Sequence, residues 1–497
     1  MPAPQQQDAQ QQIQNFALST FGGLDTSSDP TAIADEDFSW LFDYFPVGNG
    51  YLPVLSGPTQ FATGLAACNW LDYANLGGVD YAIHCDTAGK LSAVDIATGV
   101  ASTIGTGFTP GGCESTMWSN TDLLVIDSAL GYGYWDGASF TVVDATNKGI
   151  SIAVHQGRVW IASGRAVVFS APGSYTDFTT VNGGGAFAMN DPTLQGNIIA
   201  LYERESILYI VGATSVNTIG DLTVPSGSTT PVFSNSNLQA SIGTPYLRAL
   251  ADLQRIIFVA SKAGVYALYG VNAPKVSDKL NGILGLFTTI NGQLHCGVGN
   301  SLNQLIFCML GTLTHPNYTG PAIACFVNKK WFLCQQGANL TALCSAVVNS
   351  IPTVIGADSA GKLYKLFTDT GATMQARADT KLFSFDSPIY DHEIIRGGVL
   401  VDWSKNDTGV LVAITDTGQQ SATLSVSNAL SFTGAGGAAL SFTGSGGNPL
   451  TFFSVGAALL KTGFSLRGKH VGLSYRMTAC GNWVRAFLMQ VRKATAW

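Results

Sequence analysis

The sequence predicts an all-β protein: a six- or seven-bladed β-propeller with an N-terminal strap and a C-terminal β-domain. The first observation is that an apolar strand, a tight turn and a second apolar strand recur seven times along the chain. The second is that the turn Asp86-Thr87-Ala88-Gly89-Lys90-Leu91 returns almost unchanged as Asp358-Ser359-Ala360-Gly361-Lys362-Leu363, with a looser copy at 261–266. A hairpin that recurs at a spacing of tens of residues is typical of β-repeat architectures.

The strand residues and turn residues of these units agree with that prediction. The strands are rich in β-branched, aromatic and leucine residues, and the turns carry the Gly, Asp and Ser that positive φ angles favour. A propeller blade has four short strands in about 40–50 residues, so segments between the hairpins, such as 141–143 and 198–202, supply the other two strands. A β-sandwich is the alternative, although seven hairpins are many for one sandwich. The seven units are 81–94, 123–135, 158–169, 207–219, 255–269, 294–309 and 353–367.

The composition limits the function. The 497 residues exceed the ~250–300 that one hydrophobic core usually serves, so we expect more than one domain. Only 11% of the residues are charged, against about 25% in typical globular domains, which favours a surface that packs against other subunits. The net charge of −7 argues against tight phosphate binding, and we interpret the pair Lys329-Lys330 as a solvated turn.

The cysteines and the N-terminus indicate the compartment. Nine cysteines without a Cys-x-x-Cys motif, most of them in apolar strand patterns, predict buried thiols in a reducing compartment rather than disulfides. The first residues lack the charged and apolar regions of a secretory signal, so none is expected. No apolar run reaches the ~18 residues of a membrane helix, so no membrane span is expected.

Four segments follow from the changes in pattern along the chain. Residues 1–15 are Gln-rich and predict a flexible arm, or an arm ordered only by a neighbour. Residues 16–64 are rich in turns and aromatic residues and predict a strap pinned to a larger body. Residues 65–375 are the predicted propeller. Residues 376–497 are the predicted C-terminal β-domain, in which a ten-residue repeat at 428–453 predicts short strands that form a meander or a protruding loop.

The sequence offers little catalytic chemistry. His84 and His295 each lie beside a cysteine, but core histidines are the simpler interpretation of both than a metal site. The run Asp391-His392-Glu393 carries two carboxylates that could form an acid pair or a cation site, although an exposed strand is the simpler interpretation. No nucleophile elbow, phosphate-binding loop or dinucleotide motif is present. We therefore assign no catalytic, cofactor-binding or metal-binding residue and expect no cofactor and no enzyme.

A family resemblance comes from the strap. The stretch Phe21-Gly22-Gly23-Leu24-Asp25-Thr26-Ser27-Ser28-Asp29-Pro30-Thr31-Ala32-Ile33 resembles the opening of the tail-tube terminator, or nozzle, proteins of short-tailed bacteriophages. The aromatic-Pro segment Asp43-Tyr44-Phe45-Pro46 and the turns Gly48–Gly50 and Gly57-Pro58 follow the same pattern. Segments 201–216 and 257–268 are similar to the blade pattern of that family. The chain departs from it at 51–56, where the family often has arginines.

The resemblance implies a virion structural protein, assembled in the cytoplasm of the bacterial host. Six copies would form a ring at the distal end of the tail, in contact with a head-to-tail adaptor and with a tail fibre, spike or needle protein. Double-stranded DNA would pass through the lumen without sequence-specific binding. An acidic ring fits this role, because it repels phosphate and lets the duplex slide.

Two other functions are open. A carbohydrate-binding or glycoside-hydrolase β-propeller would need paired carboxylates about 5–9.5 Å apart in a central pocket. A propeller scaffold of the WD type would carry Trp-Asp and Gly-His signatures, but Trp135-Asp136 is the one Trp-Asp pair and no Gly-His pair occurs.

Overall fold

The chain forms two compact units, which are described separately. The computed structural model describes residues 13–223, 226, 231–239, 241–270, 272–385, 390–426, 432–433, 439–440, 442–443, 449–450 and 456–494. The propeller unit comprises 58–329 and 338–368. The β-sandwich unit comprises the described residues up to 57, 330–337 and those from 369 onward.

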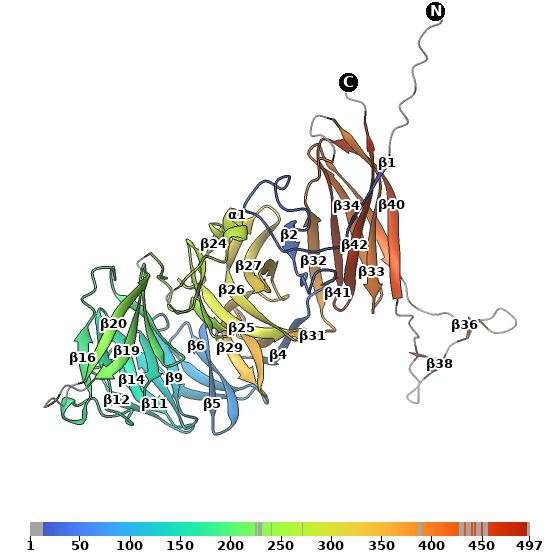
Figure 1. The fold of residues 1–497 in the computed structure, drawn as a ribbon. Coiled ribbons are helices and arrows are strands. Elements are labelled where there is room, and N and C mark those ends of the chain that lie inside the picture. The colour runs from blue at the N-terminus through green and yellow to red at the C-terminus, as the bar shows by residue number, and fades with distance from the viewer. Residues whose placement is uncertain are drawn as a thin grey trace, which may run out of the picture. The chain divides into compact units, whose positions relative to one another are not determined.

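Antiparallel sheets arranged in sequence order build the propeller unit, and their colours run from blue through green to orange in Figure 1. Blades 1 to 4 have four strands each. Their strands are β5 (Cys68–Leu76), β6 (Val79–Asp86), β7 (Leu91–Asp95) and β8 (Ala101–Gly105); β9 (Cys113–Trp118), β10 (Asp122–Asp127), β11 (Gly131–Trp135) and β12 (Phe140–Asp144); β13 (Ser151–His155), β14 (Arg158–Ser163), β15 (Ala166–Phe169) and β16 (Gly185–Ala188); β17 (Ile198–Arg204), β18 (Ile207–Gly212), β19 (Val216–Thr223) and β20 (Val232–Gln239).

Three further blades complete the described part of the propeller, so the predicted choice of six or seven blades resolves to seven. Blade 6 also includes β24 (Phe287–Thr288), and the short helices η1 (Thr180–Asn182), η2 (Asp278–Leu280) and α1 (Asn281–Leu284) lie between strands. The main strands are β21 (Leu250–Leu253), β22 (Ile256–Ser261) and β23 (Gly264–Leu268); β25 (His295–Ser301), β26 (Gln304–His315) and β27 (Tyr318–Val327); β29 (Leu340–Val348), β30 (Ile351–Asp358) and β31 (Leu363–Asp369).

A strand that precedes the first blade completes the last one. β4 (Gly57–Ala62) pairs with β31 and is the fourth strand of blade 7. The hydroxyls of Thr59 on β4 and Thr368 on β31 are 2.8 Å apart. The predicted strap therefore does not run as one piece to residue 64, because its last part belongs to the propeller.

Six of the seven predicted hairpins are the second and third strands of their blades. The unit at 294–309 differs, since it forms β25 and β26, the first two strands of blade 6. Apolar side chains from adjacent blades share the core, as where Trp70 of blade 1 packs with Leu123 and Val125 of blade 2. This sharing explains why no blade could bury its apolar faces alone.

The β-sandwich unit has two sheets. One has the order β1-β42-β33-β40 with β3 beside β42, and the other has the order β28-β2-β32-β41-β34-β35. The rings of Phe21, Phe38 and Phe487 meet between the sheets, with centroids 5.8 to 6.1 Å apart. The strands are β1 (Ile13–Leu18), β2 (Phe38–Phe42), β3 (Leu52–Pro53), β28 (Lys330–Cys334), β32 (Thr373–Thr380), β33 (His392–Trp403), β34 (Asp407–Thr415), β35 (Gln419–Val426), β40 (Gly456–Gly468), β41 (Val471–Ala479) and β42 (Trp483–Lys493).

The predicted strap is built into this unit. Phe38, Trp40, Phe42, Tyr44 and Phe45 are all buried. The ammonium of Lys330 donates to the Phe21 carbonyl at 2.6 Å and to the Gly48 carbonyl. The interpretation of Lys330 as part of a solvated turn is therefore wrong, because this lysine fastens the strap to β28.

Two predicted segments lie partly outside the described residues. Of the predicted arm at 1–15, the described residues Ile13–Asn15 form the start of β1 and pair with β42. The described parts of the repeat at 428–453 pair each copy with the next, Phe432 with Leu440 and Phe442 with Leu450. Their strands are β36 (Phe432–Thr433), β37 (Ala439–Leu440), β38 (Phe442–Thr443) and β39 (Pro449–Leu450).

Candidate functional site

An axial cavity lies at the centre of the propeller unit. It has a volume of about 450 Å³ and is lined by the innermost strand of every blade, which are β5, β9, β13, β17, β21, β25 and β29. Its polar groups include Asp72, Glu114, Glu203, Arg248 and Ser345. A central cavity with convergent polar groups is the usual place for a binding or active site, so its contacts decide what it can do.

Polar contacts join each inner strand to the next within the described residues. At six junctions at least one partner is a side chain, and at the seventh both partners are backbone groups. In order from β5–β9 round to β29–β5 the pairs are Asp72 Oδ2 with Ser115 Oγ (2.6 Å), Glu114 Oε2 with Ile152 N (2.9 Å), Ser151 Oγ with Leu201 N (2.8 Å), Arg204 Nη1 with Asp252 Oδ2 (2.9 Å), Arg248 O with Cys296 N (2.8 Å), Ser345 Oγ with Val298 N (2.8 Å) and Thr341 Oγ1 with Cys68 O (3.2 Å). We call this set the junction ring.

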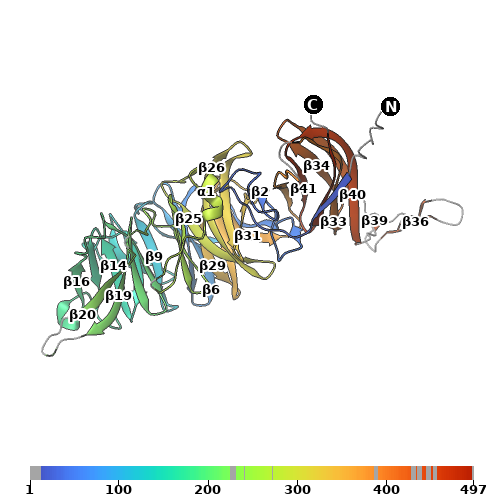
Figure 2. The same ribbon diagram turned by 45° about the horizontal axis from the view of Figure 1, so that its top comes forward.

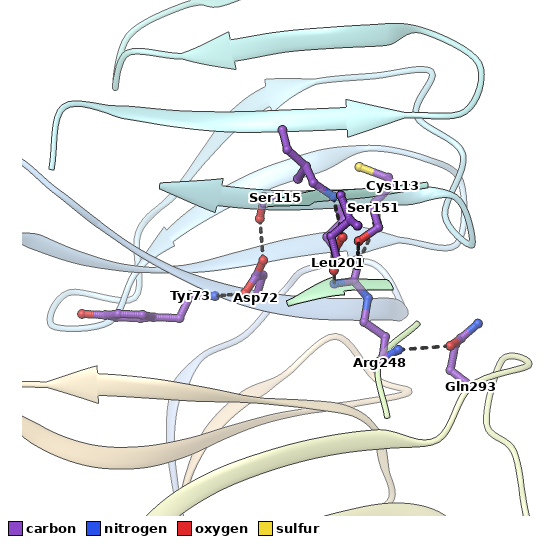
Figure 3. A network of polar contacts seen from close by, with 10 residues as sticks. Asp72, Tyr73, Cys113, Ser115, Ser151, Leu201, Arg248 and Gln293 are labelled. Atoms are coloured by element: carbon purple, nitrogen blue, oxygen red, sulfur yellow. Dashed lines mark hydrogen bonds and ion pairs between the residues drawn. The ribbon is translucent and has the colours of Figure 1, made fainter. Parts of the chain in front are cut away.

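Arg248 connects blade 5 with blades 1 and 2 (Figure 3). Its guanidinium lies over the Trp70 ring at 4.2 Å, donates to the Cys113 carbonyl and lies 3.8 Å from the Glu114 carboxylate. Its backbone N–H donates to Gln293 Oε1 at 3.3 Å. The side chain is 11% exposed, so this charge is held across the axis by protein groups.

Burial changes the acidity of the carboxyl groups beside Arg248. Burial raises the pKa of Glu114 to about 7, although Arg248 and the hydrogen bond from Ile152 oppose the shift. Burial also raises the pKa of Asp72, against the influence of Arg248 and of the hydrogen bond from Ser115. Perturbed carboxyl groups in a cavity are typical of functional sites, but structural networks produce them too. Here both carboxylates already accept hydrogen bonds from neighbouring blades, which favours a structural role.

The two histidines that the sequence singled out lie in the core. His84 on β6 and His295 on β25 are buried, and burial lowers the pKa of both, that of His295 to about 3. Among the described residues, no group of three or more His, Cys, Asp or Glu side chains is placed to hold a metal ion. All nine cysteines are free and buried, as predicted.

The run Asp391-His392-Glu393 forms neither an acid pair in the cavity nor the exposed strand that the sequence favoured, because His392 and Glu393 are buried at the start of β33. Glu393 lies in the β-sandwich unit, where its carboxylate is 2.7 Å from Arg492 and 3.5 Å from Arg467. The hydrogen bond from Arg492 lowers the pKa of Glu393. Asp391 precedes β33, and its backbone carbonyl accepts a hydrogen bond from Ala494. The Glu393 carboxylate is therefore bound in an ion cluster with Arg467 and Arg492 rather than available as an acid.

Sequence reasoning missed the junction ring and Arg248. The repeat pattern shows apolar alternation, whereas the junction residues are isolated polar positions in inner strands. A signal for Arg248 exists in the run Tyr246-Leu247-Arg248-Ala249-Leu250, where one charge interrupts an apolar segment. A buried arginine requires partners, but the sequence does not say which blades supply them.

Comparison with known proteins leaves the family open. No family model matches the chain, and no curated protein matches it. Among solved structures, the chain is similar to one in the crystal structure of BBS1N in complex with ARL6DN, with 11% identity and a TM-score of 0.41. The match covers 64% of this chain and 96% of that chain. None of the described helices is long and apolar enough to span a membrane.

Proposed function

We propose that this chain is a virion structural protein, the nozzle subunit of a short-tailed bacteriophage. Copies of it would form a ring-shaped conduit through which double-stranded DNA leaves the particle. The ring would attach to a head-to-tail adaptor and to tail fibres, spikes or a needle. The protein would act by assembly and not by catalysis.

The observation that carries the proposal is the strap and its family-like motif. A Cβ atom on Gly22 would lie 2.2 Å from Asp37 Oδ1, and one on Gly23 would lie 2.9 Å from the Trp331 backbone. The next residue, Leu24, is fully buried and donates its N–H to the Trp331 carbonyl at 2.7 Å. These contacts give the Gly-Gly-Leu motif a physical reason, because only glycine fits the two crowded positions.

The axial cavity supports a role without turnover. Its buried carboxylates and its arginine are bound to neighbouring blades, so they hold the propeller together. A volume of about 450 Å³ is that of a small-ligand pocket, far too small for duplex DNA. In this proposal the DNA therefore passes through the ring of subunits and not through the propeller axis.

Labelling of tail particles tests the proposal. An epitope tag is added to the chain in the virus that encodes it, and the particles are sedimented and labelled for electron microscopy. Label at the tail tip of short-tailed particles is the expected result. Label confined to soluble fractions, with untagged tails intact, would reject the proposal.

A carbohydrate-active propeller is the second candidate, because Asp72, Glu114 and Glu203 line the same cavity. Incubation with bacterial polysaccharides, followed by an assay for reducing sugar, tests for hydrolysis. Release of sugar that the Glu203→Gln variant abolishes would support this candidate over the nozzle. A polysaccharide-binding assay with the same variant distinguishes a lectin from an enzyme.

A further inference from the structure

Charge is segregated between the two ends of the chain. Residues 1–57 contain seven Asp and Glu residues and no Lys or Arg, whereas residues 417–497 contain seven Lys and Arg residues and no Asp or Glu. The described parts of both segments belong to the β-sandwich unit. In a chain with so few charges, separating acidic from basic residues adds little stability within one subunit. It favours a contact in which an acidic and a basic surface meet.

Five of the seven basic residues lie on one sheet, on β40 and β42. In Figure 2, β40 lies along the edge of the sheet that contains β33, with β1 in the same sheet. The exposed residues of β40 alternate, so Leu459, Lys461 and Arg467 share the outer side of this strand. Arg396 on β33 is exposed, and Arg492 on β42 is aligned with Glu393.

A groove runs across this outer side. It has a volume of about 230 Å³, and Gly397 and Gly398 lie along it between strands with longer side chains. Arg396 and Lys461 line the groove, and no acidic partner is found for either among the described residues. Glu393 already binds Arg467 and Arg492, so it does not neutralise the groove. We call Arg396, Lys461 and the glycines between them the basic groove.

The acidic counterpart is an exposed turn of the strap. Asp29, Asp35 and Glu36 are exposed at 29–36. Hydrogen bonds fix this turn, since the Asp29 carboxylate accepts from the Thr31 N–H at 2.9 Å. Lys381 lies 2.7 Å from Asp35, which leaves Asp29 and Glu36 as the exposed charges without a cation at bonding distance in the described residues. We call residues 29–36 the acidic turn.

We infer that the basic groove of one copy binds the acidic turn of a second copy. The inference rests on the proposed function, because it supplies the contact that joins neighbouring subunits of the ring. Opposite charges on two surfaces that meet favour a specific partner and speed its association. A contact between two different patches is head-to-tail, and such contacts generate closed rings when the rotation closes. Because the charges are exposed, the contact weakens as salt rises.

Charge reversal on the full-length chain tests the inference. The basic-groove variant carries Arg396→Glu and Lys461→Glu, and the acidic-turn variant carries Asp29→Lys and Glu36→Lys. A control carries Lys148→Glu and Lys262→Glu, which are exposed positions of the propeller unit with the same change in charge as the basic-groove variant. Sedimentation velocity at low and high salt measures association, and circular dichroism checks that each variant is folded.

The expected result is that either charge-reversed variant associates at least tenfold more weakly than the control. An equal mixture of the two variants regains association, because each basic surface then meets an acidic one. A wild type that stays monomeric at low salt, or one whose association is unchanged by both reversals, overturns the inference. Loss of binding to duplex DNA in the basic-groove variant, with association intact, would also overturn it. Tail labelling fails or succeeds independently of these results, so the two proposals can be told apart.

Discussion

At the scale of single residues, Arg248 is the clearest case of a charge used for structure. It lies between an aromatic ring, a backbone carbonyl and a carboxylate that come from two blades other than its own. Removing a buried cation with several partners strongly destabilises a protein, because the carboxylate opposite it is left unpaired.

We therefore expect Arg248→Met to lower the free energy of unfolding by about 3 kcal/mol. Urea denaturation followed by tryptophan fluorescence measures the change. Arg255→Met is the matched control, because Arg255 is 78% exposed and pairs with the exposed Glu205 at 3.3 Å. The control should change stability by no more than about 1 kcal/mol. Equal changes in unfolding free energy in the two variants would contradict a stabilising role for Arg248.

Glu114 gives a prediction about pH. Its folded pKa of about 7 lies above its ordinary value of 4.5, so between these pH values the folded state keeps a proton that the unfolded chain has released. Stability from this group is therefore lost as pH rises from about 4.5 to 7. We expect the melting temperature of Glu114→Gln, relative to the wild type, to increase from pH 5 to pH 8. Glu36→Gln, at an exposed position, controls for the loss of one carboxyl, and a difference that is flat with pH would contradict the prediction.

Residue types in the core could be predicted, but their polar partners could not. The nine cysteines were expected to be buried thiols because they occur in apolar strands, and the structure confirms this. Arg248 and Lys330 were missed, because their partners come from segments that are remote in sequence. Asp391 and Glu393 were considered as an acid pair, but the arginines that bind Glu393 lie about 70 to 100 residues away.

At the scale of elements, the repeated turn determines the hairpin. Asp86 Oδ1 accepts from the N–H groups of Ala88 and Lys90 at 2.8 and 2.9 Å. Asp358 Oδ1 accepts in the same way from Ala360 and Lys362, both at 2.9 Å. Gly89 and Gly361 have φ angles of 80° and 73°, which other residues rarely adopt. Nearly identical sequences thus form the same turn in two adjacent blades.

Gly361 has a second constraint that can be measured. A Cβ atom there would lie 1.8 Å from the Leu65 carbonyl oxygen, whereas one on Gly64, whose φ is 80°, would meet nothing within 4 Å. We expect Gly64→Ala to cost about 1 kcal/mol for its backbone conformation and Gly361→Ala to cost at least 2 kcal/mol more. Thermal unfolding of both variants gives the comparison. A similar loss in the two would show that backbone conformation, and not the close contact, requires glycine.

Hairpins were predictable because strand alternation and turn residues are local signals. The unit at 294–309 was also a hairpin, but its place in the blade depends on which neighbour its first strand meets. The inner turns of several blades carry positive φ at residues other than glycine, such as Leu302 at 48° and Asn303 at 61°. Such turns join the first and second strands of a blade and have no strong sequence signal, so the sequence does not show where each first strand ends.

At the scale of the whole molecule, ring closure depends on the pairing of β4 with β31. The hydroxyls of Thr59 and Thr368 lie 2.8 Å apart, so these two side chains point toward each other across the pairing and are the natural positions for an engineered bridge. We expect the variant Thr59→Cys with Thr368→Cys, once oxidised, to unfold at higher urea than its reduced form. A bridge that closes so long a loop is expected to add about 3–5 kcal/mol. An oxidised form no more stable than the reduced form would indicate that the propeller opens elsewhere first.

The seven hairpins allowed the propeller to be predicted, but not the path of the chain through the two units. Segments 16–57 and 330–337 join the β-domain because apolar strap residues and a lysine meet there across long separations. Such pairings produce no periodic pattern in the sequence. The function proposed for the chain depends on that same strap, whose motif is short and lies where packing leaves room only for glycine.

The strand that pairs with β4 is synthesised much later, and this has a consequence during translation. About 300 residues separate the end of β4 from the start of β31. At a rate of about 5–20 residues per second, β4 waits roughly 15–60 s for its partner. Throughout that interval an unpaired strand edge is open to other nascent chains, which is a recognised route to aggregation. Yield in the cell should therefore depend on chaperones that shield the growing chain, long before any question of assembly arises.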